Sequence, residues 1–164
     1  MAISKNWSVA VGGQNYDIAL EKNRLSVNGQ EPVKISKLKS KDSNMLQSVY
    51  DVMLGETLAK LVVTNKDARF VVDGKDVETN EDFDFITLPK WVYVFYVLCV
   101  VDFFAVVGGA IGGALYLTTA VFISRTAASK KMSNGGKIAA CIGIYLAATL
   151  LGLAFAIFVV STLG

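Results

Sequence analysis

The pattern of hydrophobic and polar positions divides the chain into two parts. Short alternating runs fill the first 90 residues, whereas Trp91 to Ser124 contains a single charged residue, Asp102, and Ile138 to Gly164 contains none. A run of about 20 apolar residues is enough to cross the hydrocarbon core of a bilayer. The pattern therefore predicts an α+β protein. A small antiparallel all-β domain at the N-terminus, residues 1–88, is followed by a two-helix transmembrane hairpin, residues 89–164.

Alternation interrupted by turn residues predicts the strands of the first part. Trp7–Val11 alternates, Gly12-Gly13 interrupts it, and Tyr16–Leu20 alternates again, which is typical of a β-hairpin. A third short strand is expected at Leu25–Val27, ending at Asn28-Gly29. The first part should therefore fold as an antiparallel meander.

The spacing of residues 7–29 recurs over residues 50–74. Val9–Gly12 aligns with Val52–Gly55, and Leu25–Gly29 aligns with Phe70–Gly74 after a two-residue insertion. This repeat indicates an internal duplication of a three-strand unit. Two unrelated antiparallel meanders would share the same spacing, so that alternative stays open.

Two charged segments complete the first part. Lys34–Ser43 is rich in lysine and serine, and we expect an exposed strand or loop whose charge forms a solvated face. The acidic stretch Asp73–Asp84 lacks the twelve-residue ligand order of a calcium loop, so it is interpreted as a solvated connection.

The first half of the chain resembles the small β-domains of the Fas apoptotic inhibitory molecule family. The resemblance rests on a hairpin led by Trp7, on the Val-Asn-Gly and Val-Asp-Gly turns ending at Gly29 and Gly74, and on Gly55-Glu56. It implies a compact all-β domain, a β-sandwich, that is not an enzyme and acts through contacts with other proteins. The two membrane helices depart from that family, and no functional residue carries over.

The apolar runs predict membrane helices over about residues 90–124 and 137–163. The first run would form a helix of about 51 Å, longer than one crossing needs. Trp91, Tyr93 and Tyr96 follow Pro89-Lys90 at its start, which is the chemistry of the headgroup region, so this helix should begin in the interface and cross tilted. The alternative is a buried helical hairpin in a soluble protein, which a domain of this size could not cover.

Small residues recur at four-residue spacing in both predicted helices, which favours close helix packing. An antiparallel hairpin would place Gly113 against Ala148, Gly109 against Gly152 and Ala105 against Ala156. The alternative is a glycine-zipper seam between copies in a homo-oligomer. The predicted packing residues are Ala105, Gly108, Gly109, Gly112, Gly113, Ala148, Gly152 and Ala156.

Asp102 shares a helical face with Ala105 and Gly109 and should point toward the helix seam, opposite Val159. An intramembrane carboxylate is a functional candidate by default. The preferred interpretation is that the first helix starts early and that Asp102 lies close to the interface, solvated or capped by hydroxyl groups.

The charges give conflicting indications of orientation. The connection between the helices carries Arg125, Lys130, Lys131 and Lys137 at the membrane interface, and the positive-inside rule assigns such a loop to the cytoplasm, which would place the β-domain outside. However, residues 1–24 contain no basic segment followed by an apolar one, so no cleavable signal peptide is expected. The preferred interpretation is a two-pass protein of the cell membrane with an external loop and a cytoplasmic β-domain.

Composition narrows the possible functions. The 164 residues include no histidine, and the two cysteines, Cys99 and Cys141, both lie in apolar runs, so no zinc pattern or nucleophile–base pair is present. We therefore expect no cofactor, no metal and no enzymatic activity. A net charge of +2 with 53% hydrophobic residues points to a lipid bilayer and not to nucleic acid.

Two non-enzymatic functions remain. The first is a membrane-anchored module that binds a protein partner through its β-domain, as an accessory or immunity-type subunit of a membrane complex. The second is a self-assembling membrane protein that forms a pore or a proton-sensitive element through glycine-rich helix packing around Asp102.

Overall fold

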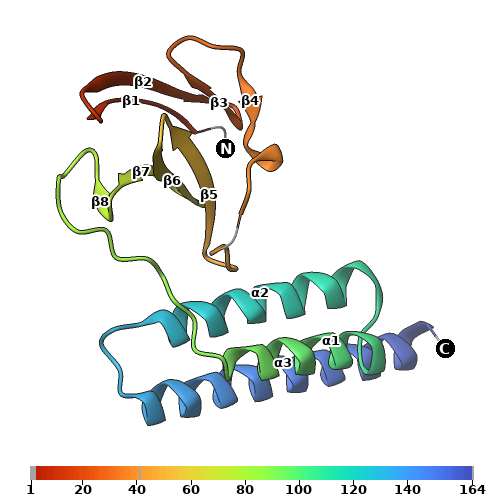
Figure 1. Ribbon diagram of the computed structural model, residues 1–164. Coiled ribbons are helices and arrows are strands. Elements are labelled where there is room, and N and C mark those ends of the chain that lie inside the picture. Colours follow the sequence, from red (N-terminus) through yellow and green to blue (C-terminus); the bar gives the residue numbers. More distant parts are fainter. Residues whose placement is uncertain (1–2, 41, 164) are drawn as a thin grey trace. The chain divides into compact units, whose positions relative to one another are not determined.

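The computed structural model describes residues 3–40 and 42–163, and the chain divides into two compact units, Met1–Ile86 and Thr87–Gly164 (Figure 1). The first unit is built from β-strands and the second from α-helices. The expected α+β class with an all-β N-terminal region is confirmed. The boundary after Ile86 lies two residues before the expected one.

The first sheet is a four-stranded antiparallel meander in the order β1-β2-β3-β4. Its strands are β1 (Ser4–Val11), β2 (Gln14–Glu21), β3 (Arg24–Val27) and β4 (Val33–Lys34). The β1–β2 turn has φ of +58° at Gly12 and +78° at Gly13. Both values lie in the left-handed region that glycine enters without steric cost, so this pair sets the hairpin register.

The second sheet repeats this plan in the order β5-β6-β7-β8. Its strands are β5 (Gln47–Leu54), β6 (Thr57–Thr64), β7 (Ala68–Val72) and β8 (Lys75–Asp76). Asn28-Gly29 after β3 and Asp73-Gly74 after β7 both have positive φ at both residues. The two sheets therefore share strand order and turn conformation, as the repeated spacing predicted, and unrelated meanders would fit the same geometry.

A common core lies between the two sheets, so the first unit is a β-sandwich. The inward-facing side chains of alternate strand positions form it, and the Trp7 and Phe70 rings lie 5.7 Å apart at its centre. The outer face of the second sheet is also covered, because Phe83 and Phe85 pack on a cluster of three valines. The sheet residues in the shared core include Trp7, Ile18, Leu20, Leu25, Val52, Leu54, Ala59, Leu61, Ala68 and Phe70.

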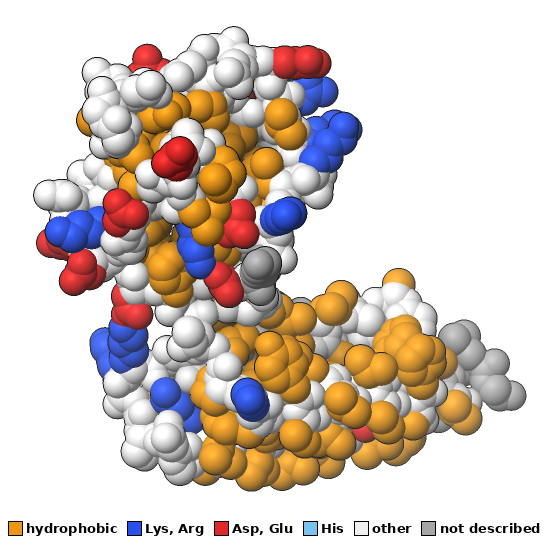
Figure 2. Space-filling view, in the orientation of Figure 1, with side chains coloured by type: hydrophobic (Ala, Val, Ile, Leu, Met, Phe, Trp, Pro, Cys, Tyr) orange, Lys and Arg blue, Asp and Glu red, His pale blue; other side chains and the backbone are white. Residues whose placement is uncertain are grey.

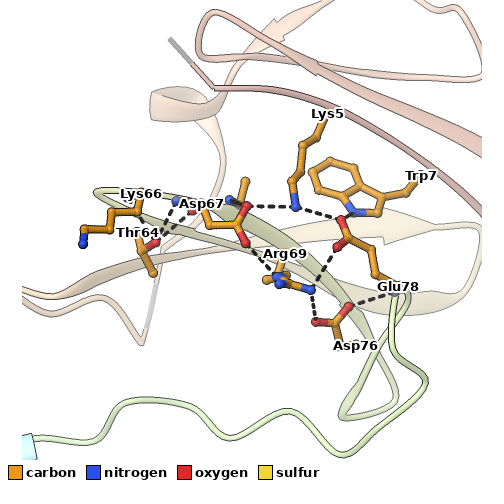
Figure 3. Close-up of polar contacts among 9 residues, drawn as sticks. Lys5, Trp7, Thr64, Lys66, Asp67, Arg69, Asp76 and Glu78 are labelled. Carbon is orange, nitrogen blue, oxygen red and sulfur yellow. Dashed lines mark hydrogen bonds and ion pairs between the residues drawn. The ribbon is translucent and has the colours of Figure 1, made fainter. Parts of the chain in front are cut away.

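A network of charged side chains joins β1 of the first sheet to β7, β8 and the following residues of the second (Figure 3). Glu78 is its centre: Oε1 accepts hydrogen bonds of 2.9 Å from both Lys5 Nζ and Trp7 Nε1, and Oε2 accepts one of 2.9 Å from Arg69 Nη1. Lys5 and Arg69 also pair with Asp67 at 2.8 Å each. The network therefore links the two sheets at one edge of the sandwich.

These contacts lower the pKa of two carboxyl groups. The hydrogen bond from Lys5, supported by Trp7 and the Arg69 charge, outweighs burial and holds the pKa of Glu78 below 4.5. Burial opposes ionisation of Asp67, but hydrogen bonds from Lys5, the Ala68 amide and Arg69 keep its pKa below 3.8. Both carboxylates are thus more easily ionised in the folded domain than in the unfolded chain.

Two expectations for charged segments need correction. The acidic stretch is not wholly solvated, because Asp76 is buried and pairs with Arg69 at 3.2 Å, while Glu78 joins the network. The segment after β4 is not wholly exposed either: a short 3₁₀ helix, Ile35–Lys37, buries Ile35 in the sandwich core. In both cases, side chains from an otherwise polar stretch pack against or pair with the sandwich.

The helical unit contains three α-helices, which corrects the expected two-helix hairpin. They are α1 (Val92–Ala105), α2 (Gly109–Ala128) and α3 (Asn134–Leu163). The first apolar run does not form one helix over 90–124 but folds back on itself, so that α2 runs antiparallel to both α1 and α3 (Figure 1). The start of α1, the end of α2 and the start of α3 therefore lie at one end of the unit.

By length and composition, one helix within the described residues could cross a membrane: α3, over Asn134–Thr162. Only 11% of its most apolar window is buried, unlike the core helix of a soluble protein. The two-pass prediction is therefore not supported. Figure 2 shows hydrophobic side chains over most of the visible face of the helical unit, with its lysines and arginines toward one end. Exposed large apolar residues include Val97, Phe104, Ile111, Leu117, Leu150, Leu151, Ile157, Phe158 and Val160.

We expect Glu78→Gln to lower the free energy of unfolding of the β-domain by about 1–2 kcal/mol at neutral pH, a value reduced by the partial exposure of the network. Because the folded pKa values of Glu78 and Asp67 are lowered, their contribution is complete above the unfolded values of 4.5 and 3.8. It is lost as the pH falls through the folded values. Urea unfolding followed by tryptophan fluorescence between neutral pH and pH of about 3 measures both effects.

Glu81→Gln is the matched control, because Glu81 is exposed and lies only three residues from Glu78. It should unfold like the unmodified chain at every pH. Equal losses in the two variants would contradict a specific role for Glu78.

Candidate functional site

Asp102 lies one turn before the end of α1 and contacts α3. The Thr149 hydroxyl donates a hydrogen bond of 2.7 Å to Asp102 Oδ2 and also lies 3.1 Å from the Tyr145 carbonyl oxygen one turn earlier. Asp102 thus points toward a helix seam, as expected. Its partner differs, since Val159 was predicted opposite it and Thr149 is found there.

Two tyrosine hydroxyls complete this polar cluster, which we define as Asp102, Tyr116, Tyr145 and Thr149. Tyr145 lies one turn before Thr149, which donates to its carbonyl oxygen, and the Tyr116 hydroxyl of α2 lies against Gly152, one turn after Thr149. Tyr116 is only 4% exposed, and its hydroxyl has no hydrogen-bond partner among the described residues. All three helices therefore contribute to one polar cluster inside an otherwise apolar unit.

The chemistry available to the cluster is limited to a proton or a weak polar ligand. Asp102 is the only carboxylate between Thr87 and Gly164, so the cluster combines one acid with neutral hydroxyls. Over residues 3–40 and 42–163, no three histidine, cysteine, aspartate or glutamate side chains come together as metal ligands. Carboxyl groups inside apolar segments are costly to bury and are rarely found there without a polar partner, which Thr149 supplies here.

A second polar pair joins α1 to α2. The hydroxyls of Tyr96 and Ser124 are 2.6 Å apart, and Ser124 also donates to the Ala120 carbonyl. Tyr96, predicted to lie at the membrane interface, is half-buried and contacts α2 through this pair. Ser124 and Thr149 are hydroxyl residues inside long apolar runs. That position in the sequence could have indicated that both make polar contacts between helices.

The glycines that were predicted to line a helix seam mainly form the α1–α2 turn. Gly108 is extended and Gly109 has a φ of +76°, which a side chain would disfavour. A Cβ on Gly112 would lie 1.6 Å from the Val107 carbonyl oxygen, so only glycine allows the chain to return this closely. A Cβ on Gly113 would meet Phe103 of α1 at 3.7 Å. These glycines thus serve the tight turn between α1 and α2.

In α3 the predicted small residues have mixed surroundings. A Cβ on Gly152 would lie 2.9 Å from the Tyr116 hydroxyl, so Gly152 faces α2 at Tyr116 and not at Gly109. Ala148 is buried and Ala156 is half-buried, whereas Ala105 at the end of α1 is exposed. The antiparallel pairing exists, but its register is displaced, because the prediction assumed a continuous first helix.

The predicted interface residues lie at the basic end of the unit. The Trp91 ring packs edge-on against Phe95 at 6.1 Å, and Tyr93 packs against Tyr96 at 5.6 Å. Trp91 is half-buried and Tyr93 is exposed. Arg125, Lys130 and Lys131 are exposed, and Lys137 in the first turn of α3 is half-buried.

Comparisons with protein-family models, with curated proteins and with solved structures found no match to this chain. The geometry of the two units therefore supplies the argument for function.

Gly112→Ala should destabilise the helical unit by about 3 kcal/mol, since the added methyl group collides with backbone and not with a movable side chain. Helix propensity alone predicts the opposite effect, an increase of up to about 1 kcal/mol in the free energy of unfolding. Thermal unfolding of the full chain in detergent, followed by circular dichroism, measures the difference.

Gly143→Ala provides the matched control, because a Cβ at this position of α3 would meet nothing within 4 Å. We expect it to be neutral or slightly stabilising. If both variants were equally stable, the close approach at Gly112 would not constrain the turn.

Proposed function

We propose that this chain is a non-enzymatic, membrane-anchored protein-binding module, an accessory or immunity-type subunit of a membrane complex. The β-domain recognises the partner and the helical unit holds it at the bilayer. The observation that carries the proposal is the contrast between the units: the sandwich encloses its own core, while the helices expose large apolar side chains.

Helix lengths support a specific form of anchoring. At 1.5 Å per residue α3 extends over about 45 Å, enough to cross the hydrocarbon core, whereas α1 extends over only about 21 Å. We infer that α3 crosses the bilayer once and that α1 and α2 form a re-entrant hairpin packed against it. Protein contacts would satisfy the backbone of the α1–α2 turn, which is the condition for irregular structure at membrane depth.

This arrangement removes the conflict between the positive charge of the loop after α2 and the missing signal peptide, which indicated opposite sides for the β-domain. In a two-pass protein the basic loop and the β-domain lie on opposite sides, but a re-entrant hairpin returns the chain to the side it entered from. Lys90, Arg125, Lys130, Lys131 and Lys137 then all lie at one surface, together with the connection to the β-domain. The positive-inside rule assigns that surface, and with it the β-domain, to the cytoplasm.

A surface of the sandwich has the composition of a protein contact site. Val33, Met53 and Leu58 are between 44% and 60% exposed and line a groove of about 540 Å³. Charged side chains surround them, among them Lys37 and Asp51. An apolar centre with a polar rim is the usual anatomy of protein interfaces.

A second function is favoured by the Asp102 cluster. The bond between Asp102 and Thr149 and the buried Tyr116 hydroxyl support a proton-sensitive element formed by assembly of several chains. The same cluster would hold α1 against α3 in an anchor, so the two functions predict different effects of one substitution.

Cysteine labelling in intact cells tests the anchoring. Thr162→Cys, about 37 Å along α3 from Lys137, should react with an impermeant maleimide. Met132→Cys in the loop and Glu56→Cys in the β-domain should react only after the membrane is permeabilised. The unmodified chain should stay unlabelled, because Cys99 and Cys141 are buried. Opposite labelling of Met132→Cys and Glu56→Cys would re-establish the two-pass arrangement.

Asp102→Asn separates the two functions. For an anchored binding module, we expect a photo-cross-linker at Leu58 to capture the same partner in the parent chain and in the Asp102→Asn chain. Proteoliposomes of both chains should be equally tight to protons. Thr149→Val is the control, since it removes the hydroxyl without removing the charge. A proton flux that requires Asp102 would establish the second function and refute the first.

A further inference from the structure

Three of the four edge strands in the two sheets are protected against further pairing. β4 is two residues long and follows Pro32, which has no N–H group. The edge of β5 is covered by the segment before it, where the Lys39 carbonyl oxygen accepts a hydrogen bond of 2.8 Å from the Asp51 amide. Residues 80–83 cover β8 through backbone hydrogen bonds to that strand and its turn. Such covers are a common way to prevent unwanted strand addition.

The fourth edge strand, β1, turns a row of backbone groups away from its sheet. It pairs with β2 in an unbroken register over eight residues. Both the amide and the carbonyl oxygen of Asp17 bind Asn28, on the β3 side of β2. Ser8 lies opposite Asp17, so its own N–H and C=O point away from β2. The alternation of the ladder gives this orientation to every second residue of β1, which are Ser4, Asn6, Ser8 and Ala10.

These four residues leave their backbone groups available to another strand. Within the described ranges, 3–40 and 42–163, the only strand that pairs with β1 is β2. The four side chains are uncharged and exposed, and the single charged residue of the strand, Lys5, binds Glu78 instead. Outward lysines, prolines, bulges and a short length usually protect an edge, and β1 has none of these features. It is therefore an open template for strand addition.

We propose that β1 is a dimerisation edge, to which a second copy of this chain adds its own β1 in antiparallel orientation. The register is centred on Trp7, which lies opposite Trp7 of the second copy. Ser4 then lies opposite Ala10 of the other copy, and the reverse pair forms by symmetry. Asn6 lies opposite Ser8 in the same way. This is the one register that gives all four outward-facing residues a hydrogen-bonded partner within the set.

Two properties of β1 favour a second copy over an unrelated strand. In the register centred on Trp7, Lys5 lies opposite Val9 of the second copy, so no like charges meet. Ile3 and Val11, which are half-buried at the margin of the sandwich core, lie opposite each other. Each copy would therefore cover apolar surface of the other. The sequence of this edge is thus complementary to itself.

The dimer goes beyond the proposed partner binding and does not depend on it. No residue of β1 lines the apolar groove that contains Met53 and Leu58, so the paired edge leaves the groove open. A dimer would present two such grooves. A membrane complex with two matching sites would then be bound more tightly than by a single chain, because the second contact forms within the complex already made by the first.

Paired substitutions at positions 6 and 8 test the edge. Asn6→Lys/Ser8→Lys places like charges opposite each other across the dimer, whereas Asn6→Glu/Ser8→Lys places opposite charges there. Analytical ultracentrifugation of the full chain in excess detergent gives the dissociation constant of the dimer. We expect the first variant to raise this constant by about tenfold or more, and the matched second variant to leave it unchanged or lower it.

A proline substitution tests the backbone contact. Ser8→Pro removes an N–H group that points away from β2, so the β1–β2 bonds remain while the bonds to a second copy are lost. This variant should be monomeric and should keep the tryptophan fluorescence of the folded domain. If it does not fold, the two charge variants still decide the question.

Cysteine cross-linking reports the register. A mixture of Asn6→Cys and Ser8→Cys full chains should form a disulfide-linked dimer on mild oxidation, because residues opposite each other in a hydrogen-bonded pair have Cα atoms about 5.5 Å apart. A mixture of Ser4→Cys and Ser8→Cys chains should not, since these positions are displaced by two residues. The unmodified chain controls for Cys99 and Cys141, which are buried.

Three results would overturn the proposal. One is a full chain that is monomeric at every concentration, which would leave the edge to a strand of another protein. Another is dimerisation that is equal in the unmodified chain and in both charge variants, which would assign it to the helices. The third is equal cross-linking in the two cysteine mixtures. None of these results alters the maleimide labelling that tests the anchoring, so the two proposals fail separately.

Discussion

The return of the chain at Gly112 determines the arrangement of the helical unit. The backbone at Gly112 approaches the Val107 carbonyl so closely that no side chain fits between them. The amides of Val106 and Val107 both donate to the Asp102 carbonyl oxygen, which ends α1 at this point. Without the turn, the first apolar run would continue as one helix, and the α1–α3 contact at Asp102 and the Tyr96–Ser124 bond would be lost.

The sandwich depends on a different kind of constraint. Its core joins side chains from alternate positions of both sheets, and the charged network around Glu78 links the sheets at their edge. The hydrophobic core provides most of the stability, because exposed ion pairs contribute little. The network instead favours one placement of the two sheets relative to each other. This is because Lys5, Trp7 and Arg69 all donate to the Glu78 carboxylate.

Local patterns in the sequence predicted most of the β-domain. Alternation around Trp7 and the Gly12-Gly13 and Asp73-Gly74 turns located strands and hairpins, since both signals depend on neighbouring residues alone. The burial of Asp76 and Ile35 could not be predicted this way. Their environments come from β7 and from the opposite sheet, which local periodicity does not report.

For the helical unit, the sequence predicted the apolar composition but not the arrangement of the helices. The hydropathy of the first apolar run is the same whether it forms one long helix or two helices joined by a turn. One long helix was therefore assumed, and Gly108 and Gly109 were interpreted as helix-packing residues. The register that followed placed Asp102 opposite Val159, and the partner Thr149 was missed because the direction of α1 relative to α3 was wrong. Asp102 itself stood out because it is the single charge in its run, which is independent of the helix arrangement.

The short connection between the two units limits how far they can separate. Only residues 87–91 join the last contact of the sandwich, where Gln47 binds the backbone of Ile86, to the first turn of α1. Five residues span at most about 17 Å when fully extended, and Pro89 restricts them further. Under the proposed anchoring by α3, a molecule bound by the sandwich would therefore stay close to the lipid surface. There its effective concentration toward a membrane-bound target greatly exceeds its concentration in solution.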